Sequence, residues 1–398
     1  MLAAFSSPAW ADPSPTYAQL LARLDQTPVA TEARALEEAA EARVRQARVR
    51  PNPTVSLEAE NMLGSGPFSG FGAADTTLSV SQDLELFGRR GARIDAARAD
   101  ANTAALRRNL ANVDAAGRLA LVYAEAEAAQ RRADLADETL TLTLADTRAA
   151  LVLVEEGREP LLRGIQGESE AAAARAAADE AQAERDAAFA RLTAVAQLPA
   201  PVTSVPASLL DRPPVSAPSA SEGPPALRVA EAEREAAERR IAVERVRARP
   251  DISATVGVRR FEAENANAFL FGLSMPLPLF DRNRGNIDAA RAEYNAAEAR
   301  LAGARLDAQA DRAAAEARLA ASASRVRAAD AGVSSAEEAY QLSRIGFEAG
   351  RISQLELRAT RNALVSARTA AVDARLARVR AEIDLARQDG RAPFEGPQ

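Results

Sequence analysis

The stretch Ile94-Asp95-Ala96-Ala97-Arg98-Ala99 recurs unchanged as Ile287-Asp288-Ala289-Ala290-Arg291-Ala292, 193 residues further along the chain. The same offset relates two further pairs of dipeptides, Leu86-Phe87 with Leu279-Phe280 and Gly157-Arg158 with Gly350-Arg351. A register that holds without a gap over about seventy residues indicates an internal repeat. The 398-residue chain is therefore two copies of one structural unit.

Long proline-free segments contain the repeated motif in both copies. Residues 92–156 contain no proline and one glycine, and residues 286–345 contain no proline and two glycines. Both are rich in alanine, the strongest helix former. At a rise of 1.5 Å per residue, each segment predicts a helix of about 90 Å. Each copy continues into a second helix, which gives two predicted antiparallel hairpins at residues 92–198 and 286–388.

The turns of both hairpins carry the repeated Gly-Arg pair. Gly157 and Gly350 suit the left-handed conformation that ends a helix. Pro160 and Ser353 suit the first positions of the helix that follows. The sequence therefore predicts a tight turn at the tip of each hairpin.

Four short segments alternate apolar and polar residues with the period of a β-strand, at residues 54–61, 77–84, 252–260 and 269–277. Each strand would have one apolar and one polar face. Two hairpins resting on a soluble core would explain this pattern, but the sequence offers no such core. Strands of this length with one polar face also suit a membrane barrel around water. The predicted lumen side chains are Glu58, Glu60, Asp83 and Arg259.

Four strands cannot close a barrel, and an open strand edge in lipid leaves backbone groups without hydrogen-bond partners. Several chains must then share one barrel, and three copies supply roughly twelve strands, enough for an aqueous lumen. The expected fold is α+β and mostly α: a trimeric barrel with four strands per protomer, joined to long helical hairpins.

The expected organisation follows from the repeat and from proline content. Residues 2–5 are apolar, and Ala9-Trp10-Ala11 has the small-x-small pattern of a cleavage site. Prolines crowd the middle of the chain, which predicts an extended linker. The segments are a signal-peptide remnant at 1–11, a first repeat at 12–198, the linker at 199–225, a second repeat at 226–390 and a tail at 391–398.

Composition narrows the function. The 50 basic residues are interleaved with 56 acidic ones and the net charge is -6, so nucleic acid is not an expected partner. The chain has no His and no Cys, which excludes a Ser-His-Asp triad and His or thiolate metal sites. No phosphate-binding loop follows a strand. We expect a protein that is not an enzyme and has no cofactor.

The duplicated hairpins, the long helices and the Pro-rich linker resemble the TolC-type outer-membrane efflux family over nearly the whole chain. Two stretches, Arg50-Pro51-Asn52-Pro53 and the segment from Pro278-Leu279-Phe280-Asp281 to Ile287, are similar to its cobalt-zinc-cadmium (heavy-metal) branch. The resemblance implies a homotrimer in the outer membrane of a Gram-negative bacterium, with the helices in the periplasm. It also implies a passive exit duct for heavy-metal cations, docked on a periplasmic adaptor and an inner-membrane RND pump.

The resemblance also implies roles for residues at the hairpin tips. The adaptor would dock at Gly157, Arg158, Gly350, Arg351 and Ser353, for which helix capping is an alternative role. Glu356 would form an acidic ring that narrows the pore, with a solvated helix face as the alternative. Ala359 stands where a second acid is often found, so a double acidic ring is not expected.

Three alternatives remain open from sequence. A multidrug or general solute duct has the same architecture, because an exit duct usually lacks a substrate-selective site. A periplasmic adaptor would have one hairpin flanked by small β domains, whereas this chain has two hairpins. A structural coiled coil would stay soluble without detergent.

Overall fold

The computed structural model describes residues 14–206, 209–213 and 223–394. The chain divides into two compact units, each of which contains parts of both repeats. Unit 1 comprises Met1–Glu32, Asn109–Pro225 and Asp307–Gln398, and unit 2 comprises Ala33–Arg108 and Ala226–Leu306. The expected signal-peptide remnant at residues 1–11 lies outside the described residues.

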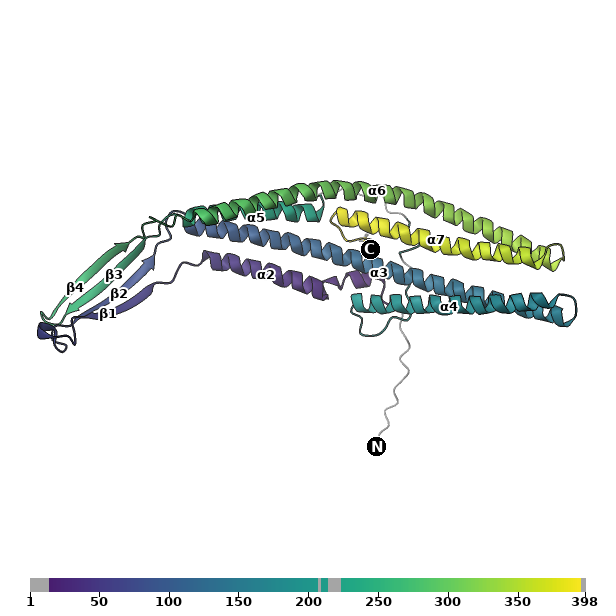
Figure 1. Cartoon of the computed structure of the whole chain (residues 1–398), viewed down its shortest axis with the longest axis horizontal. Helices are drawn as coiled ribbons and strands as arrows, with labels where there is room; N and C mark the ends of the chain where they lie inside the picture. Colours follow the sequence, from purple (N-terminus) through teal and green to yellow (C-terminus); the bar gives the residue numbers. More distant parts are fainter. Residues whose placement is uncertain (1–13, 207–208, 214–222, 395–398) are drawn as a thin grey trace, which may run out of the picture. The chain divides into compact units, whose positions relative to one another are not determined.

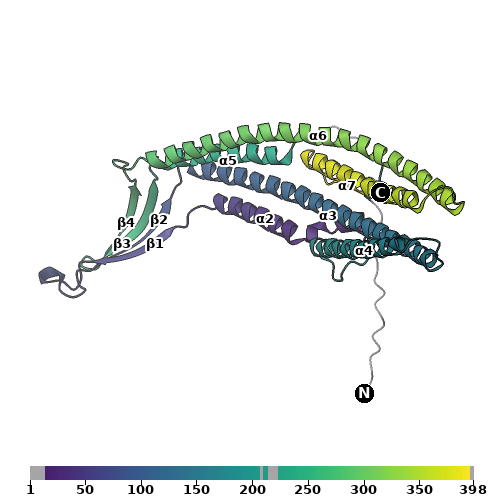
Figure 2. The ribbon, with the colours of Figure 1, turned by 45° about the vertical axis from the view of Figure 1, so that its right-hand side comes forward.

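The helices occupy the proline-free segments. The two longest are α3 (Arg89–Glu155) with 67 residues and α6 (Arg284–Glu348) with 65 residues. In unit 1, α4 (Leu161–Val195) runs back along α3, and α7 (Gln354–Gln388) runs back along α6 (Figures 1 and 2). The remaining helical segments are α1 (Tyr17–Leu21), η1 (Leu24–Gln26), α2 (Pro28–Arg48), η2 (Gly66–Phe68) and α5 (Pro225–Arg247).

Both hairpin turns use the repeated glycine in the left-handed conformation. Gly157 has φ 71° and Gly350 has φ 67°, values at which a side chain would be strained. The next residue closes each turn by donating its backbone N–H to a carbonyl of the preceding helix: Arg158 to Leu153 at 2.9 Å, and Arg351 to Gly346 at 2.8 Å. The two tips therefore have the same backbone conformation, as the duplicated sequence predicts.

The strands of both repeats form one antiparallel sheet in the order β1-β2-β3-β4 (Figure 1). They are β1 (Thr54–Glu60), β2 (Asp75–Asp83), β3 (Ser253–Phe261) and β4 (Ala266–Ser274). The two predicted hairpins thus join through pairing of β2 with β3.

The fourth strand lies three residues earlier than the interval 269–277 expected from its apolar pattern. Asn265, at φ 48°, ends a short turn that sets Ala266 opposite Phe261, so the turn fixes the register. Pro276 has no N–H to continue the ladder. Met275, which the alternation placed on the apolar face, therefore follows the strand.

Unit 1 has a core in which α3 is buried on more than one side. Leu119, Tyr123 and Ala126 are at most 2% exposed, and Ala128 and Ala129 are buried as well. Buried residues this close in sequence point in several directions, which marks a central helix. Small alanine side chains allow this because neighbouring helices can approach closely.

The start of the chain and the linker complete this core. The ring of Tyr17 meets the ring of Tyr123 edge-on at 5.9 Å, and the Tyr17 hydroxyl donates to the carbonyl of Pro393 at 2.8 Å. The linker is more than a spacer, because Val202, Val205, Leu209 and Leu210 are buried. A stretch of the linker at residues 214–222 lies outside the described residues.

Buried charges hold the linker backbone. Glu127, only 2% exposed, accepts the N–H of Leu209 at 3.0 Å and pairs with Arg131 at 2.7 Å. Arg131 also donates to Asp211 at 2.6 Å, and this hydrogen bond holds the pKa of Asp211 below its ordinary value. Arg378 donates to the carbonyl of Leu210 at 3.0 Å. Residues of α3 and α7 thus satisfy linker groups that burial removes from water.

We predict that Glu127→Ala loosens the linker. The change leaves the N–H groups of Leu209 and Leu210 without their acceptor, a local cost of about 2–4 kcal/mol. Limited proteolysis by proteinase K should cut the linker faster than in the unchanged protein. Glu125→Ala is the matched control because Glu125, which lies on α3 like Glu127, makes an exposed pair with Arg380 of α7. Equal cleavage rates for the two variants would contradict the prediction.

Candidate functional site

The four predicted lumen residues lie on one face of the sheet. Thr77 pairs in register with Glu58 on one side and Arg259 on the other. Arg259 donates to the Thr77 hydroxyl at 2.8 Å and to Glu60, while Ser253 donates to Asp83 at 2.5 Å. Arg259 therefore neutralises Glu60. Among the described residues, neither Glu58 nor Asp83 has a cationic partner.

The opposite face of the sheet is apolar and exposed. Phe269 and Phe271 are 81% and 78% exposed, far more than large apolar side chains that have a packing partner. The face continues across all four strands through Val55, Leu57, Leu78, Val80, Val256, Val258, Phe269, Phe271 and Leu273. This face matches the lipid-facing surface that the alternation predicts.

Both outer strands of the sheet have one edge without a partner in this chain. In the sheet as described, β1 pairs with β2 alone and β4 with β3 alone. Such edges present N–H and C=O groups that must be satisfied elsewhere. The four strands are therefore an incomplete sheet.

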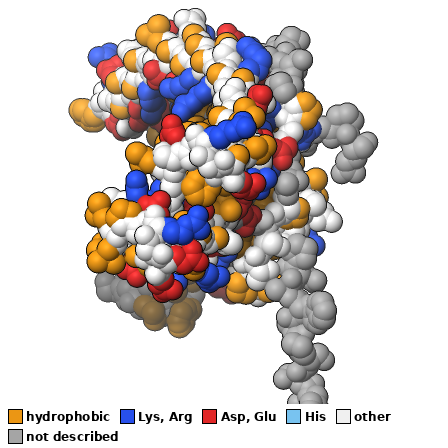
Figure 3. Space-filling model, turned by 90° about the vertical axis from the view of Figure 1, so that its right-hand side faces the viewer, with side chains coloured by type: hydrophobic (Ala, Val, Ile, Leu, Met, Phe, Trp, Pro, Cys, Tyr) orange, Lys and Arg blue, Asp and Glu red, His pale blue; other side chains and the backbone are white. Residues whose placement is uncertain are grey.

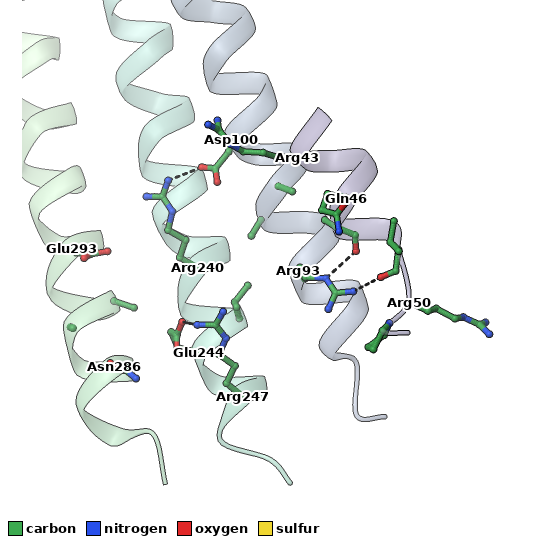
Figure 4. Close-up of a pocket in the computed structure, with 18 residues that line it drawn as sticks. Arg43, Gln46, Arg50, Arg93, Asp100, Arg240, Glu244, Arg247, Asn286 and Glu293 are labelled. Atoms are coloured by element: carbon green, nitrogen blue, oxygen red, sulfur yellow. Dashed lines mark hydrogen bonds and ion pairs between the residues drawn. The ribbon is translucent and has the colours of Figure 1, made fainter. Parts of the chain in front are cut away.

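Arginine side chains bind the chain segments that connect the helices to the sheet (Figure 4). Arg93 donates to the carbonyls of Ala47 and Val49 at 3.0 and 2.9 Å, and it pairs with Glu85. These carbonyls belong to the last turn of α2 and the residues after it, where no helical partner exists. Across the same pocket, Arg240 of α5 pairs with Asp100 of α3 at 2.6 Å. The C-terminus of α2 is thus held by a cation, which is a favourable arrangement, and an ion pair joins α3 to α5.

The five residues predicted to dock an adaptor lie at the two hairpin tips. Arg158 is 71% exposed and within 3.5 Å of Glu156. Gly157 and Gly350 shape the turns, and Ser353 caps α7, so the expected capping roles are present. Figure 3 views these tips end-on, with charged and apolar side chains intermingled on the surface.

Sequence reasoning missed an apolar component of the tips. Val152 and Leu162 of the first hairpin are 47% and 61% exposed. Their equivalents at the 193-residue offset, Ile345 and Leu355, are 58% and 62% exposed. Comparison of the two repeats position by position would have revealed them. Both tips thus present matching apolar side chains to their surroundings.

Glu356 is exposed and forms a capping box with Ser353. Its carboxylate accepts the Ser353 N–H at 2.9 Å, and the Ser353 hydroxyl accepts the Glu356 N–H at 3.3 Å. The signal for this cap, a Ser followed three residues later by Glu, is present in the sequence. The carboxylate predicted to narrow a pore therefore also fixes the start of α7.

A cluster of charges just beyond this cap has no signal in the sequence. Arg358 and Arg361 of α7 are only 7% and 5% exposed. Arg358 pairs with Glu170 of α4 at 2.9 Å, and Arg361 pairs with Asp146 of α3. Burial raises the pKa of Asp146, although both arginines act against that shift. The cluster ties the first turns of α7 to the α3–α4 hairpin.

Two features are absent from the described residues, a membrane-spanning helix and a cluster of metal-binding side chains. No helix in this part of the chain combines the length and the hydropathy needed to cross a lipid bilayer. The same residues contain no group of three or more acidic side chains arranged to hold one metal ion.

Known metal-resistance proteins are similar to this chain. It is 40% identical over 280 residues to the nickel-cobalt-cadmium resistance protein NccC of Alcaligenes xylosoxydans xylosoxydans, covering 70% of this chain and 64% of that protein. It is 40% identical to the nickel and cobalt resistance protein CnrC of Cupriavidus metallidurans over 63% of this chain and 60% of that one. The cobalt-zinc-cadmium resistance protein CzcC of the same organism is 29% identical, with 62% and 59% covered. The chain spans less than two thirds of the length of these relatives.

The fold has solved counterparts. The crystal structure of the outer membrane protein VceC from Vibrio cholerae superposes with a TM-score of 0.76 at 19% identity, covering 95% of this chain and 97% of that one. This likeness confirms the predicted TolC-like fold of strands and long helical hairpins.

The family profile described as "Outer membrane efflux protein" matches residues 23–196 and 217–391, which include most of both repeats. A match over most of the chain establishes the family and, with it, the predicted location in the outer membrane. The similarity to nickel, cobalt, cadmium and zinc resistance proteins confirms the resemblance to the heavy-metal branch. The chain therefore belongs to the outer membrane efflux protein family.

Proposed function

We propose that three copies of this chain form a passive outer-membrane duct through which heavy-metal cations leave the cell. The observation that carries the proposal is a sheet with one exposed apolar face and one polar face, in a chain 40% identical to a nickel-cobalt-cadmium resistance protein. In this proposal the apolar face contacts lipid and the polar face lines water. Three copies complete the sheet because the edges of β1 and β4 need partners.

The chain acts as a conduit and not as an enzyme. It has no His or Cys, the residues that most often serve as general bases, thiol nucleophiles and transition-metal ligands. Glu58 and Asp83 would attract cations weakly and release them, as a conduit requires. The energy for export comes from an inner-membrane RND pump, which reaches the duct through a periplasmic adaptor.

The hairpin tips are the docking surface for the adaptor. They carry Arg158 and Arg351 beside the matching apolar positions Val152 and Ile345. Exposed apolar side chains ringed by charge are typical of protein contact sites. Capping of the helices by the same tip residues is compatible with docking, because a rigid turn presents its side chains in fixed positions.

Glu356 and the Arg358–Arg361 cluster together control the inner end of the duct. Three copies of Glu356 form an acidic ring that favours cations over anions. The cluster holds the segment that carries this ring against α3 and α4. Opening the duct would separate Arg361 from Asp146, leaving charges that need water or a new partner.

A strain that lacks the gene should lose resistance to metals. We expect growth inhibition at lower nickel, cobalt, cadmium and zinc concentrations than in the parent strain, with recovery when the gene is restored, because the exported cations then lack their conduit. Copper and a panel of hydrophobic drugs serve as comparison. Sensitivity to drugs alone would reassign the duct to multidrug efflux, and unchanged metal sensitivity would contradict the proposed cargo.

Replacing Glu356 by Gln should weaken cation preference without disturbing the helix cap, since the amide oxygen can still accept the Ser353 N–H. The measurement is the reversal potential of purified protein in planar lipid bilayers under a salt gradient. We expect a shift of several millivolts toward the nonselective value. Glu348→Gln, an exposed acid at the end of α6, is the control and should leave the potential unchanged. An unaltered reversal potential in the Glu356 variant would show that Glu356 does not line the pore.

Arg361→Ala should favour the open duct because it removes the tie between α7 and α3. We expect a several-fold rise in channel conductance in planar bilayers and increased entry of a large antibiotic such as vancomycin. Arg344→Ala is the matched control, because Arg344 lies near the same tip and pairs with Glu348 within one helix at 4.0 Å. A conductance equal to that of the control would show that the cluster does not hold the duct closed.

A further inference from the structure

We propose that the contact between neighbouring copies of the chain repeats, in particular ion pairs and in one strand register, the contact that the chain makes between its own two repeats. The proposal rests on the trimer of the proposed function and names the side chains that join its members. Internal duplication makes this inference possible, because a surface that is buried in the first repeat has an equivalent in the second.

Equivalent positions can be assigned for each element. The offset from α3 to α6 is 193 residues, from the repeated motif. Between α2 and α5 it is 197 residues, since Arg43 and Arg48-Val49 match Arg240 and Arg245-Val246. Arg247 and Ala248 are two extra residues, so Arg50-Pro51 matches Arg249-Pro250 and the offset from β1 to β3 is 199 residues.

Contacts inside each repeat agree with these offsets to within one residue. In the first repeat, Arg90 of α3 donates to the carbonyl of Arg48 in α2 at 2.7 Å. Its equivalent in the second repeat, Asn283, stands directly before α6 and donates to the carbonyl of Glu244 in α5 at 2.9 Å, one residue before Arg245, the equivalent of Arg48. The two copies are therefore alike in structure as well as in sequence.

In unit 2, the first repeat meets the second through α3 and α5. Asp100 of α3 pairs with Arg240 of α5 at 2.6 Å. Arg89 donates to the carbonyl of Arg249 at 2.5 Å and pairs with Asp251 at 3.2 Å. These contacts accompany the pairing of β2 with β3.

The equivalents of these partners lie on the outer elements of unit 2 and are unpaired. Asp100 corresponds to Glu293 of α6, and Arg240 corresponds to Arg43 of α2. Both are exposed, and within the described residues neither forms an ion pair (Figure 4). Their charges are those of the pair they replicate, so Glu293 of one copy can pair with Arg43 of the next.

A second arginine follows the same rule. Arg89 corresponds to Arg282, which is exposed and has no hydrogen-bond partner in the part of the chain described here. Arg249 corresponds to Arg50 of α2's C-terminal extension. Arg282 can therefore donate to the backbone carbonyl of Arg50 in the next copy, as Arg89 does to Arg249.

The strands give a matching register. Val80 lies opposite Val256 where β2 pairs with β3. The equivalents are Leu273 of β4 and Leu57 of β1, which places Leu273 of one copy opposite Leu57 of the next. Both belong to the exposed apolar face, so the pairing extends that face without a break.

Unit 1 carries an independent pair of the same kind. Arg132 of α3 pairs with Asp373 of α7 at 2.5 Å. The equivalents at 193 residues are Arg325 of α6 and Glu180 of α4, again one cation and one anion. Both are exposed, and neither has an ion-pair partner among the residues described.

Burial differs between equivalent positions in the way that a missing neighbour predicts. Ala120 and Ala124 of α3 are fully buried, whereas their equivalents on α6, Ala313 and Ala317, are exposed. Val113 of α3 is 9% exposed, and Leu306 of α6 is 68% exposed. The surface of α6 is therefore built like a contact surface but lacks its partner. A second copy fits it, because this copy supplies the α2 and α4 elements whose charges complement α6.

Cysteine cross-linking tests the proposal directly, since the chain contains no Cys. The double variant Glu293→Cys with Arg43→Cys, and separately Arg325→Cys with Glu180→Cys, should form dimers and closed trimers on mild oxidation of the protein in outer membranes. Asp100→Cys with Arg240→Cys should link within one chain and serves as the positive control. Glu293→Cys with Arg325→Cys, both on α6, is the mismatched control. Cross-linking no stronger than in the mismatched control would overturn the inferred contacts.

Charge reversal provides a second readout. Glu293→Arg should lower the fraction of trimer that resists mild detergent dissociation by about threefold, since it sets two arginines against each other. Adding Arg43→Glu should restore it, whereas Arg43→Glu alone should not. Additive losses in the double variant would contradict the pairing. If the cysteine variants keep metal resistance but do not cross-link, the inferred contacts are wrong and the proposed duct is unaffected. If the protein forms no trimer at all, the proposed duct is wrong.

Discussion

The architecture of this protein depends on the need of every strand backbone for hydrogen-bond partners. In lipid, an N–H or C=O group without a partner costs several kcal/mol, so a sheet must have no open edge. The chain supplies four strands, with β1 and β4 at the edges of the sheet it forms. Its apolar face is exposed and its polar face carries hydrogen-bonded Ser, Thr and Arg side chains. A single chain therefore leaves two strand edges and one apolar face of its sheet without partners, and an assembly of several chains would supply partners for the edges.

Alanine and glycine set how the helices pack. Tyr123 and Leu192 supply large buried side chains in unit 1, but most buried positions of α3 are alanine. At the hairpin, Gly167 lets α4 approach α3 so closely that the Thr147 hydroxyl donates to its carbonyl at 2.9 Å. Helices of this composition bury little apolar area against any one neighbour, so they depend on several.

Arginine side chains make many of the contacts that join elements far apart in the chain. It caps the end of α2 through Arg93, holds the linker through Arg378 and ties α7 to α3 through Arg361. A planar guanidinium with five donors can satisfy several carbonyls and a carboxylate together. Because Arg stays charged at all physiological pH values and the chain has no His, the cationic side of each tie does not titrate in that range.

The sequence by itself determined the features that depend on local periodicity. The 193-residue repeat, the proline-free helices, the glycine turns and the two-faced strands all follow from spacing along the chain, and the structure contains them. Tertiary structure decided what depends on residues far apart. Arg361 meets Asp146 across 215 residues and Glu127 meets Leu209 across 82, and no local pattern encodes such pairs. The strand β4 spans Ala266–Ser274 and not the interval expected from the apolar pattern, because the turn that ends at Asn265 sets the register of β4 against β3. Finally, only the structure distinguished equivalent positions, burying Ala124 and leaving Ala317 exposed, because burial depends on neighbours and not on the residue itself.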